Sequence, residues 1–518
     1  MVKNIEITLT PKQASTESDY MDAAAKAAGV ERGAIASVRI IRRSIDARKR
    51  GDIKVVMALE LYVDEPGAAD EFHAQWGDVS RATAVVVVGA GPAGLFAALE
   101  LVELGYRPIV LERGKNVSER KFDIAALNRN EAVNGDSNYA FGEGGAGTYS
   151  DGKLYTRSKK RGSNRRALEI FCYHGASPEI LYESHPHIGT DKLPRIIKAM
   201  RQTIVASGGV VLFNSRVKEL LIEDSKIKGV VTESGERVEG AAVVLATGHS
   251  ARDIYEMLHR NGVLLEAKNF AVGLRVEHPQ ALIDMIQYKQ PAGEYLPAAS
   301  YNLVAQAKGR GVYSFCMCPG GFIVPAMTSA GECVINGMSP SGRNNIYANS
   351  GIVTEVRRED IADYEQHFGV MAGLRFQEQL EQMAFAQGGG AQVAPAQRLT
   401  DFVDGRHTSM VLPTSYHPGL VPSDIDHWLP KFVGGALRDG FRQFDGKMRG
   451  FLTSEAQVIG VESRTSSPLR IPRSRDTYMH PQIMGLYPTG EGAGFAGGII
   501  SSAVDGMVVA SAVAEYVK

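Results

Sequence analysis

Hydrophobic and polar positions along the first 80 residues predict a small module that is separate from the rest of the chain. Strict alternation marks strands, and one apolar stripe at helical spacing closes at Gly29, a residue suited to a helix carboxyl terminus. The predicted elements are a strand at 5–9, a helix at 20–28 and strands at 37–44 and 53–63. A turn-forming Asp64-Glu65-Pro66-Gly67 ends them, so we predict an α+β module of ferredoxin-like type over residues 1–80.

A continuous apolar strand follows, and the motif at its end dominates the chain. Val85 to Val88 run without a polar residue, as in a strand buried on both faces of a parallel sheet. They lead into Gly89-Ala90-Gly91-Pro92-Ala93-Gly94, a helix at 92–104 and a second strand that ends in Glu112. In this G-x-G-x-x-G arrangement the glycines permit a tight turn, the approach of a pyrophosphate and close helix packing, and the acid accepts hydrogen bonds from ribose hydroxyls. Since the helix amino terminus favours phosphates, the pattern predicts a dinucleotide site.

Two further glycine-rich stretches belong to the same predicted site. Gly144-Gly145-Ala146-Gly147-Thr148 has no packing purpose of its own and lets backbone lie against a flat ring or a phosphate; the alternative is a plain flexible loop. Near the end, Gly490 to Ile499 contains the dinucleotide pattern by letter, but no acid-tipped strand follows it. We interpret it as a second contact with the same cofactor, with Glu491 toward ribityl or pyrophosphate oxygens and a helix at 501–517 behind it.

The remaining pattern predicts the rest of the nucleotide-binding sheet and a large insertion. A helix at 193–207 precedes a strand at 210–213, a β-meander at 216–232 and a buried strand that stops at Thr247-Gly248, after which Ser250 is predicted to cap a helix. The long stretch that follows alternates short strands, loops and a few helices. The predicted domains are a nucleotide-binding domain over 81–160, 193–262 and 481–518, and a substrate or cap domain over 161–192 and 263–480.

Composition sets the class of protein without adding a partner. With 518 residues, 44% hydrophobic and 22% charged, the chain is long enough for two or three globular domains. A net charge of −1 and a pI near 6.9 give no overall attraction to nucleic acid or acidic membranes. Four cysteines make no disulfide framework, and no signal-type or membrane-spanning apolar run is evident, so we expect a cytoplasmic protein.

Two basic segments keep an anionic partner open locally. Residues 39–54 carry seven Lys or Arg against Asp46 and Asp52, and residues 157–166 carry six basic groups without an acid. Such segments could dock RNA or an anionic substrate, whereas a solvated strand edge or loop is the default interpretation. We therefore expect a small-molecule substrate, with an anionic group as one option, and neither a membrane nor nucleic acid as the main partner. The pattern specifies no oligomeric state.

Several strings resemble those of known flavoproteins. The first glycine motif with Glu112, then Ala246-Thr247-Gly248 and Thr489-Gly490-Glu491-Gly492, resemble in this order the two-domain FAD-binding proteins of the glutathione-reductase-like class. Longer strings, such as Phe315-Cys316-Met317-Cys318-Pro319 and Glu462-Ser463-Arg464-Thr465, are similar to those of the uncharacterised bacterial FAD-dependent (NAD(FAD)-utilising) dehydrogenases. The resemblance covers nearly the whole chain.

This resemblance implies FAD as cofactor and an α/β architecture. The expected fold is a Rossmann-like FAD-binding domain, with a parallel sheet plus β-meander, an inserted mixed α+β substrate domain and the small amino-terminal module. The residues expected to contact FAD are Gly89, Gly91, Pro92, Ala93, Gly94, Glu112, Arg113, Gly144, Gly145, Ala146, Gly147, Thr148, Val217, Thr247, Gly248, Gly490, Glu491, Gly497, Gly498 and Ile499. The carboxy-terminal helix would point at the flavin pyrimidine edge, where negative charge develops on reduction.

Candidate redox and acid–base groups lie outside the glycine motifs. No second strand-borne G-x-G-x-x-G with its acid is present, so electrons come from a substrate or from NAD(P)H that docks transiently. Cys316 and Cys318 form a C-x-C pair, for which packed thiols are favoured over a strained redox disulfide. His278 is a candidate general base, and Arg464 and Arg343 are candidate partners of a substrate carboxylate, each weighed against a structural role. No metal-ligand cluster stands out, so no metal is predicted.

These features together predict an FAD-dependent oxidoreductase. The expected reaction is hydride transfer between a small organic substrate and flavin N5 at the loop Gly144 to Thr148. The alternatives are an RNA-associated flavoprotein that uses the basic segments, and a flavin monooxygenase.

Overall fold

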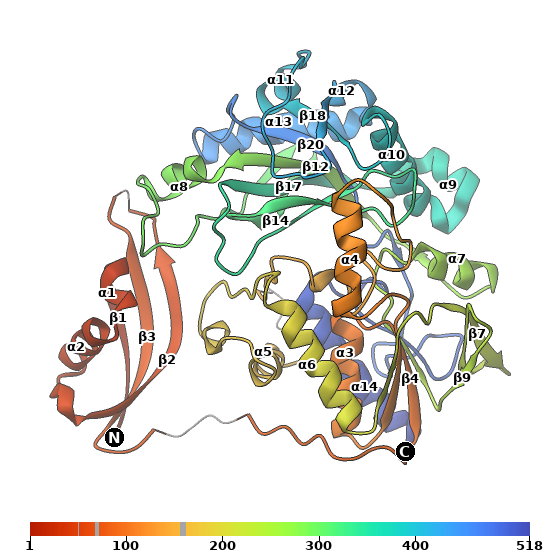
Figure 1. Cartoon of the computed structure of the whole chain (residues 1–518), viewed down its shortest axis with the longest axis horizontal. Helices are drawn as coiled ribbons and strands as arrows, with labels where there is room; N and C mark the ends of the chain where they lie inside the picture. Colours follow the sequence, from red (N-terminus) through yellow and green to blue (C-terminus); the bar gives the residue numbers. More distant parts are fainter. Residues whose placement is uncertain (50, 68–71, 156–161) are drawn as a thin grey trace.

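The computed structural model describes residues 1–49, 51–67, 72–155 and 162–518. Figure 1 shows three parts: a small amino-terminal module at the left, a domain built on a parallel sheet at the lower right, and a cap built on a larger sheet above it. The order of these parts along the chain matches the predicted domain order, with differences at two boundaries that are described below.

The amino-terminal module is a three-stranded antiparallel sheet covered by helices on one face. Alternate side chains of β3, among them Met57, Leu59 and Leu61, are buried under α2, as their period-two pattern predicted. Its elements are β1 (Val2–Leu9), α1 (Pro11–Ser15), α2 (Glu17–Ala28), β2 (Ile35–Asp46) and β3 (Lys54–Val63), with sheet order β1-β3-β2. The predicted strand–helix–strand–strand order is confirmed. The ferredoxin-like type is not, because that fold repeats the unit and the described part of the module has three strands.

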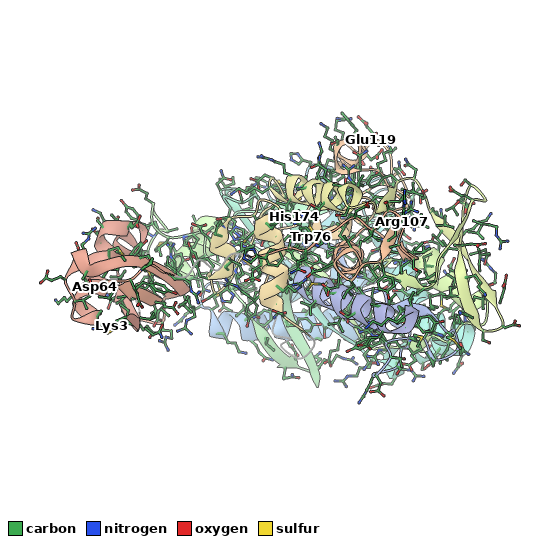
Figure 2. All side chains as sticks on the ribbon, turned by 90° about the horizontal axis from the view of Figure 1, so that it is seen from below. Lys3, Asp64, Trp76, Arg107, Glu119 and His174 are labelled. Carbon is green, nitrogen blue, oxygen red and sulfur yellow. The ribbon has the colours of Figure 1, made fainter. Side chains whose placement is uncertain are left out.

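A short strand-like bridge joins the module to the main body, and Ile53 of the module is buried in the core of the cap. The backbone N–H of Arg43 donates to the Tyr182 carbonyl, and the Ser184 N–H donates to the Arg43 carbonyl, at 2.9 and 3.0 Å. Beyond the module, Trp76 of the connecting segment packs 5.2 Å from the ring of His174. Figure 2 shows this pair on the main body and Lys3 and Asp64 on the projecting module.

The second domain is built on a five-stranded, fully parallel sheet. Val85 and Val87 face one core and Val86 and Val88 the other, which explains the unbroken apolar run. The sheet order is β22 (Leu486–Pro488), β10 (Val243–Leu245), β4 (Ala84–Val88), β5 (Arg107–Leu111) and β6 (Val210–Leu212). One face carries α3 (Pro92–Glu103), α5 (Asn164–Tyr173), α6 (Leu193–Ala206) and α14 (Ile499–Val517). The other carries the β-meander of β7 (Val217–Glu223), β8 (Lys226–Thr232) and β9 (Arg237–Glu239), with α7 (Arg252–Arg260).

Three local expectations need correction in this domain. The sequence pattern predicts that the segment 161–192 belongs to the cap, but Ala167, Ile170 and Phe171 of α5 belong to the core under the parallel sheet. Conversely, α4 (Val117–Asn128) lies within the predicted nucleotide-binding range yet contributes Ile124 and Leu127 to the cap core. Helix α7 begins after Ala251 without a side-chain cap, so Ser250 does not have the predicted capping role.

The cap is a seven-stranded sheet backed by helices. Its core is aromatic-rich and includes Phe402, Phe441, Phe444 and Phe451. The sheet order is β13 (Val304–Ala307), β14 (Arg310–Cys318), β17 (Tyr347–Val356), β12 (Phe270–Pro279), β20 (Gln457–Glu462), β18 (Ala394–Arg398) and β19 (Leu420–Pro422). The helices are α8 (Gln280–Tyr288), α9 (Ala362–Phe368), α10 (Ala372–Gln387), α11 (Leu399–Asp404), α12 (Ile425–Trp428) and α13 (Lys431–Lys447). The short pair β15 (Phe322–Pro325) with β16 (Ile335–Met338) completes the cap. A second short pair, β11 (Glu266–Ala267) with β21 (Leu469–Arg470), places Leu469 in the core beside the β-meander and α7.

Helix α14 is long and apolar enough to cross a membrane, and in the described chain it alone passes that test. Its window is 61% buried inside the protein, chiefly against α3 and α5. This is the pattern of a core helix, and its length reflects packing along the parallel sheet.

Candidate functional site

One large cavity of about 670 Å³ lies between the carboxyl ends of the parallel strands and the cap strand β14. The first turn after each of β4, β5 and β10 contributes to its wall, as expected for a ligand site in an open parallel sheet. The sheet side of the wall includes Gly91, Pro92, Ala93, Glu112, Arg113, Gly145, Ala146, Gly147, Val217, Thr247, Gly248, Gly490, Glu491, Gly497, Gly498 and Ile499. The cap side includes Ser314, Phe315, Cys316, Met317, Cys318, Asn336 and Arg343.

The three glycines of the first motif have different reasons to be glycine. Gly89 has φ +102°, and a Cβ there would lie 2.5 Å from the Ala246 carbonyl oxygen. A Cβ on Gly94 would overlap the Gly89 carbonyl oxygen, so this residue serves helix–strand packing and does not line the cavity. Gly91 is different, because a Cβ there would meet only Gly145, at 3.9 Å. The fold thus tolerates a side chain at Gly91, and the space it would fill belongs to the cavity.

Glu112 joins three backbone segments of the wall. Its Oε2 accepts from the Ala90 N–H at 2.9 Å, and its Oε1 accepts from the Gly114 and Gly142 N–H groups at 2.9 and 3.0 Å. A carboxylate offers about four acceptor positions, so capacity for one further donor remains. The predicted contact with a ribose hydroxyl is compatible with this count, and Glu112 also has a positioning role that the motif did not reveal.

Arg113 and Val217 line the same end of the cavity. The Arg113 guanidinium lies 4.1 Å from the centroid of the Phe141 ring and donates to Asp136 and Asp253 at 2.7 and 2.8 Å. These pairs fix the guanidinium as a planar wall, with its charge compensated by two carboxylates. Val217 begins the β-meander beside it.

The loop 144–148 forms a tight turn over the first glycine motif. Gly145, Ala146 and Gly147 line the cavity, whereas Gly144 and Thr148 lie behind it, with the Thr148 hydroxyl donating to the Glu143 carbonyl at 2.8 Å. Beneath the loop, the fully buried Arg120 donates to the backbone carbonyls of residues 138, 139 and 143. Burial without a carboxylate contact lowers the pKa of Arg120 to about 10. These hydrogen bonds hold the loop in place, so the alternative of a plain flexible loop is not supported.

At the carboxyl end, Gly490 to Ile499 forms the opposite wall. Asp505 of α14 accepts from the Gly490 N–H and the Thr489 hydroxyl, both at 2.8 Å, and pairs with Arg473 at 2.6 Å. Gly497 and Gly498 have nothing within 4 Å of a Cβ position. Their open space adjoins the space in front of Gly91, so the residues present form a backbone cradle that fits a flat, phosphate-bearing cofactor such as FAD.

His249 is a cavity residue that the sequence reasoning missed. It directly follows Thr247-Gly248, the only local signal that could have drawn attention to it. Its Nδ1 lies 3.0 Å from Glu491 Oε2, and its Nε2 lies 2.9 Å from the Arg464 carbonyl oxygen. The imidazole thus connects the two glycine-rich walls with the cap.

Arg464 does not have a free guanidinium for a substrate. Its Nη2 pairs with Glu332 and Glu381 at 2.8 and 2.7 Å, and its Nη1 donates to Thr328 at 2.7 Å. The buried Glu381 also receives Arg252 at 2.8 Å, and these two arginines lower the pKa of the Glu381 carboxyl to about 2. The predicted carboxylate fork at Arg464 is therefore not supported by its surroundings, although its backbone reaches the cavity.

His278 lies away from the cavity wall. It is fully buried in β12, with Nε2 2.8 Å from the Phe451 carbonyl, and burial lowers the pKa of its imidazole to about 4. Because it does not reach the cavity, its predicted role as a general base is not supported.

Cys316 and Cys318 both line the cavity as free thiols. They stand at a bulge in β14 where Cys316 has φ +45°, and Cys318 donates to the Cys316 carbonyl at 3.2 Å. Cys318 is buried, whereas Cys316 is exposed at the cavity wall. Desolvation raises the pKa of the Cys318 thiol, which agrees with the packed interpretation for that residue. The exposed Cys316 does not fit that interpretation. Among the described residues no group of three or more His, Cys, Asp or Glu could hold a metal ion.

Comparison with protein families gives matches along most of the chain. A model described as "FAD-dependent protein, C-terminal domain-like" matches residues 269–465, and an FAD binding domain matches 82–121. A glucose inhibited division protein A model matches 190–307, and a domain of unknown function matches 1–62.

Individual relatives divide into one full-length and several partial ones. An uncharacterized protein of Clostridium beijerinckii is 42% identical over 502 residues, which is 93% of each chain. The tRNA uridine 5-carboxymethylaminomethyl modification enzyme MnmG of Lactobacillus acidophilus is 26% identical over 34% of this chain and 26% of its own. Among solved structures, a geranylgeranyl bacteriochlorophyll reductase-like protein from Thermoplasma acidophilum matches with 14% identity and a TM-score of 0.35, over 84% of this chain and 78% of its own.

The glycine cradle, the parallel sheet and the FAD binding domain match define the class as an FAD-binding flavoprotein. The chain belongs to the FAD-dependent flavoprotein family whose carboxy-terminal domain covers residues 269–465, together with its full-length relative from Clostridium beijerinckii. Its placement in the glutathione-reductase-like class stays a prediction.

Proposed function

We propose that this flavoprotein is a dehydrogenase that transfers hydride between a small organic substrate and FAD. One observation carries the proposal: a single continuous cavity joins the glycine cradle to the cap strand β14. A cofactor held by the cradle and a substrate held by the cap would therefore share one enclosed space. When bound, FAD supplies a two-electron hydride acceptor.

The protein's own contribution is binding, orientation and the exclusion of water. The open backbone at Gly91, Gly497 and Gly498 would bind the cofactor, and Glu112 would accept a ribose hydroxyl. The cap strand carries Phe315 and Met317 into the wall opposite, which would exclude water from the reacting carbon.

Electrons would come from the organic substrate or from NAD(P)H that has no domain of its own. In the described residues one parallel sheet carries one glycine motif with its acid, and the cap sheet is largely antiparallel. A second nucleotide-binding domain of this type is absent from that part of the chain. NAD(P)H would therefore act only by docking transiently in the same cavity.

The partial likeness to tRNA-modifying enzymes favours a second candidate, an RNA-associated flavoprotein. The basic segment 39–54 weighs against it, because most of its described cations have acidic partners. The pairs are Arg39–Glu60, Arg42–Glu6, Arg43–Glu183, Arg48–Asp46, Lys49–Asp52 and Lys54–Asp52. In the other segment, Arg165 and Arg166 pair with Glu169 and Glu103, while 157–161 lies outside the described residues. Paired cations release few counterions on binding a phosphate backbone.

Spectroscopy of the purified protein tests the proposal. We expect flavin absorption bands, and anaerobic bleaching of those bands by an organic substrate or by NADH or NADPH. Rapid oxygen consumption with a nicotinamide donor, coupled to substrate oxygenation, would instead indicate the monooxygenase alternative. Salt-sensitive tRNA retention that is lost in an Arg42→Ala/Arg43→Ala/Arg48→Ala variant would favour the RNA-associated candidate. A protein that cannot be reconstituted with FAD would contradict the proposal.

A further inference from the structure

The cap side of the cavity has a positive charge that the FAD cradle does not use. Three charged side chains line this region, Asp151, Lys153 and Arg343, giving a net of one positive charge. All three come from outside the glycine motifs, two from the segment after the loop 144–148 and one from the turn before β17. By contrast, the cations near the cradle have carboxylate partners: Arg113 and Arg216 share Asp136 and Asp253, and Arg464 pairs with Glu332 and Glu381.

Lys153 retains donor capacity. Its ammonium donates to the Met317 carbonyl at the β14 bulge and lies 4.0 Å from Asp151 Oδ2, beyond hydrogen-bond distance. Within the described chain it has no other acceptor, and an ammonium carries three N–H donors. Its side chain is 38% exposed. It therefore offers a charged donor to a ligand without losing its own support.

Arg343 is held in place but keeps one edge of its guanidinium open. Its Nε and Nη2 donate to the two Asp151 carboxylate oxygens at 3.1 and 2.7 Å. Nη1 has no acceptor in the described part of the protein. The side chain is only 13% exposed, so its charge is weakly screened. Its backbone is held as well, because the Arg343 N–H donates to the Pro340 carbonyl and the Asn345 N–H donates to the Gly320 carbonyl, at 3.0 and 3.1 Å.

The surroundings explain why these two cations are brought together. The bulge between Phe315 and Cys318 turns the Met317 carbonyl toward Lys153, which ties β14 to the segment after the glycine loop. At the outer edge, Tyr155 and His185 pack edge to face with ring centroids 5.1 Å apart, and both line the cavity. The subsite therefore adjoins both an aromatic edge and the two thiols of β14.

We propose that Lys153 and Arg343 form an anion subsite that binds a carboxylate or phosphate group of the substrate. The subsite rests on the proposed function, and it narrows the substrate class to organic anions whose oxidisable carbon lies in the same cavity. A planar guanidinium edge and a nearby ammonium suit either anion, since both present several acceptor oxygens. Asp151 sets the orientation of Arg343 and limits the positive charge to one.

Anion binding to the FAD-loaded protein tests the subsite. Malonate and inorganic phosphate are titrated separately at low ionic strength, with flavin absorbance and calorimetry as readouts. Lys153→Gln should weaken binding of the preferred anion by about ten- to a hundredfold, the usual effect of one charged hydrogen bond. Lys198→Gln, on the exposed face of α6 and away from the cavity, is the matched control and should leave binding unchanged.

Arg343→Gln is a second test variant. If it unfolds because the buried Asp151 carboxylate has lost its partner, the double variant Arg343→Gln/Asp151→Asn removes that carboxylate as well. Weakening of malonate alone assigns a carboxylate substrate, and weakening of phosphate alone assigns a phosphate ester. Equal affinity in Lys153→Gln and the control, or no anion binding at low salt, overturns the subsite. FAD content is measured on the same samples, so a loss of FAD binding, which contradicts the proposed function, is distinguished from loss of anion binding alone.

Discussion

His249 and Glu491 are paired at the cavity wall. His249 Nδ1 lies 3.0 Å from a Glu491 carboxylate oxygen, while its Nε2 lies 2.9 Å from the Arg464 carbonyl, so both ring nitrogens face acceptors. The imidazole therefore ties the carboxy-terminal glycine segment to the backbone of Arg464.

We expect His249 and Glu491 to support binding of FAD. His249→Ala leaves the Glu491 carboxylate and the Arg464 carbonyl without their partner, so FAD affinity should fall by about five- to a hundredfold. Glu491→Gln keeps a polar partner for the imidazole and should cost less. Fluorescence titration with FAD measures both, and an affinity in His249→Ala equal to that of the unaltered protein would show that the pair does not support the cofactor site.

Two glycine variants distinguish a loss of FAD affinity from a loss of stability. Gly91→Ala adds a methyl group that meets only Gly145 at 3.9 Å, so the fold should be retained while FAD affinity falls by about tenfold or more. Gly94→Ala forces a methyl group onto the Gly89 carbonyl and should destabilise the domain by about 1–3 kcal/mol. Urea unfolding without FAD and FAD titration distinguish the two effects. Full FAD affinity in a folded Gly91→Ala protein would remove Gly91 from the site.

We expect Arg464 to stabilise the fold and not to bind the substrate. Arg464→Met leaves the buried Glu332 and Glu381 carboxylates with one arginine partner fewer, which should lower the free energy of unfolding by about 3–5 kcal/mol. Arg375→Met removes a half-exposed arginine that pairs with Glu256 and Glu378, and should cost less than about 1 kcal/mol. Denaturant unfolding compares them. If Arg464→Met were as stable as Arg375→Met and lost only substrate affinity, the structural assignment would be wrong.

His278 should make the protein sensitive to mild acid. Burial lowers its folded-state pKa from 6.5 to about 4, so its neutral form is preferred and its contribution is fully present above pH 6.5. Stability should be lost as pH falls from 6.5 toward 4, by roughly 3 kcal/mol in total. His278→Gln keeps a donor for the Phe451 carbonyl and does not titrate. Its unfolding free energy should therefore fall less between pH 7 and pH 5; an identical slope would refute the assignment.

The glycine motifs were predictable because their chemistry is local. Strand, turn and helix follow one another within a few residues, and the pyrophosphate geometry demands glycine there. The cap was harder: α13 contains Gly434, Gly435, Gly440 and Gly446, which lower its helical signal. The structure shows why one of them is present, since a Cβ on Gly440 would lie 2.6 Å from Val312 of β14.

The errors in the candidate catalytic residues have the same physical origin. Neighbouring residues in the sequence indicate His278 and Arg464 as candidates, but the burial of His278 and the ion pairs of Arg464 are set by residues far along the chain. Lys153 and Arg343 are brought to one wall by the packing of the cap on the parallel sheet. The hydrophobic pattern of the sequence cannot predict that these two side chains lie close together, because their proximity depends on tertiary contacts alone.

The strand order of the parallel sheet has a consequence for synthesis on the ribosome. The last strand, β22, pairs with β10, and α14 packs on α3, although β22 is translated about 400 residues after β4. The wall contributed by Gly490 to Ile499 is therefore missing until those residues have left the ribosome. The amino-terminal module can fold early, whereas cofactor capture must wait for β22 and the glycine segment that follows it.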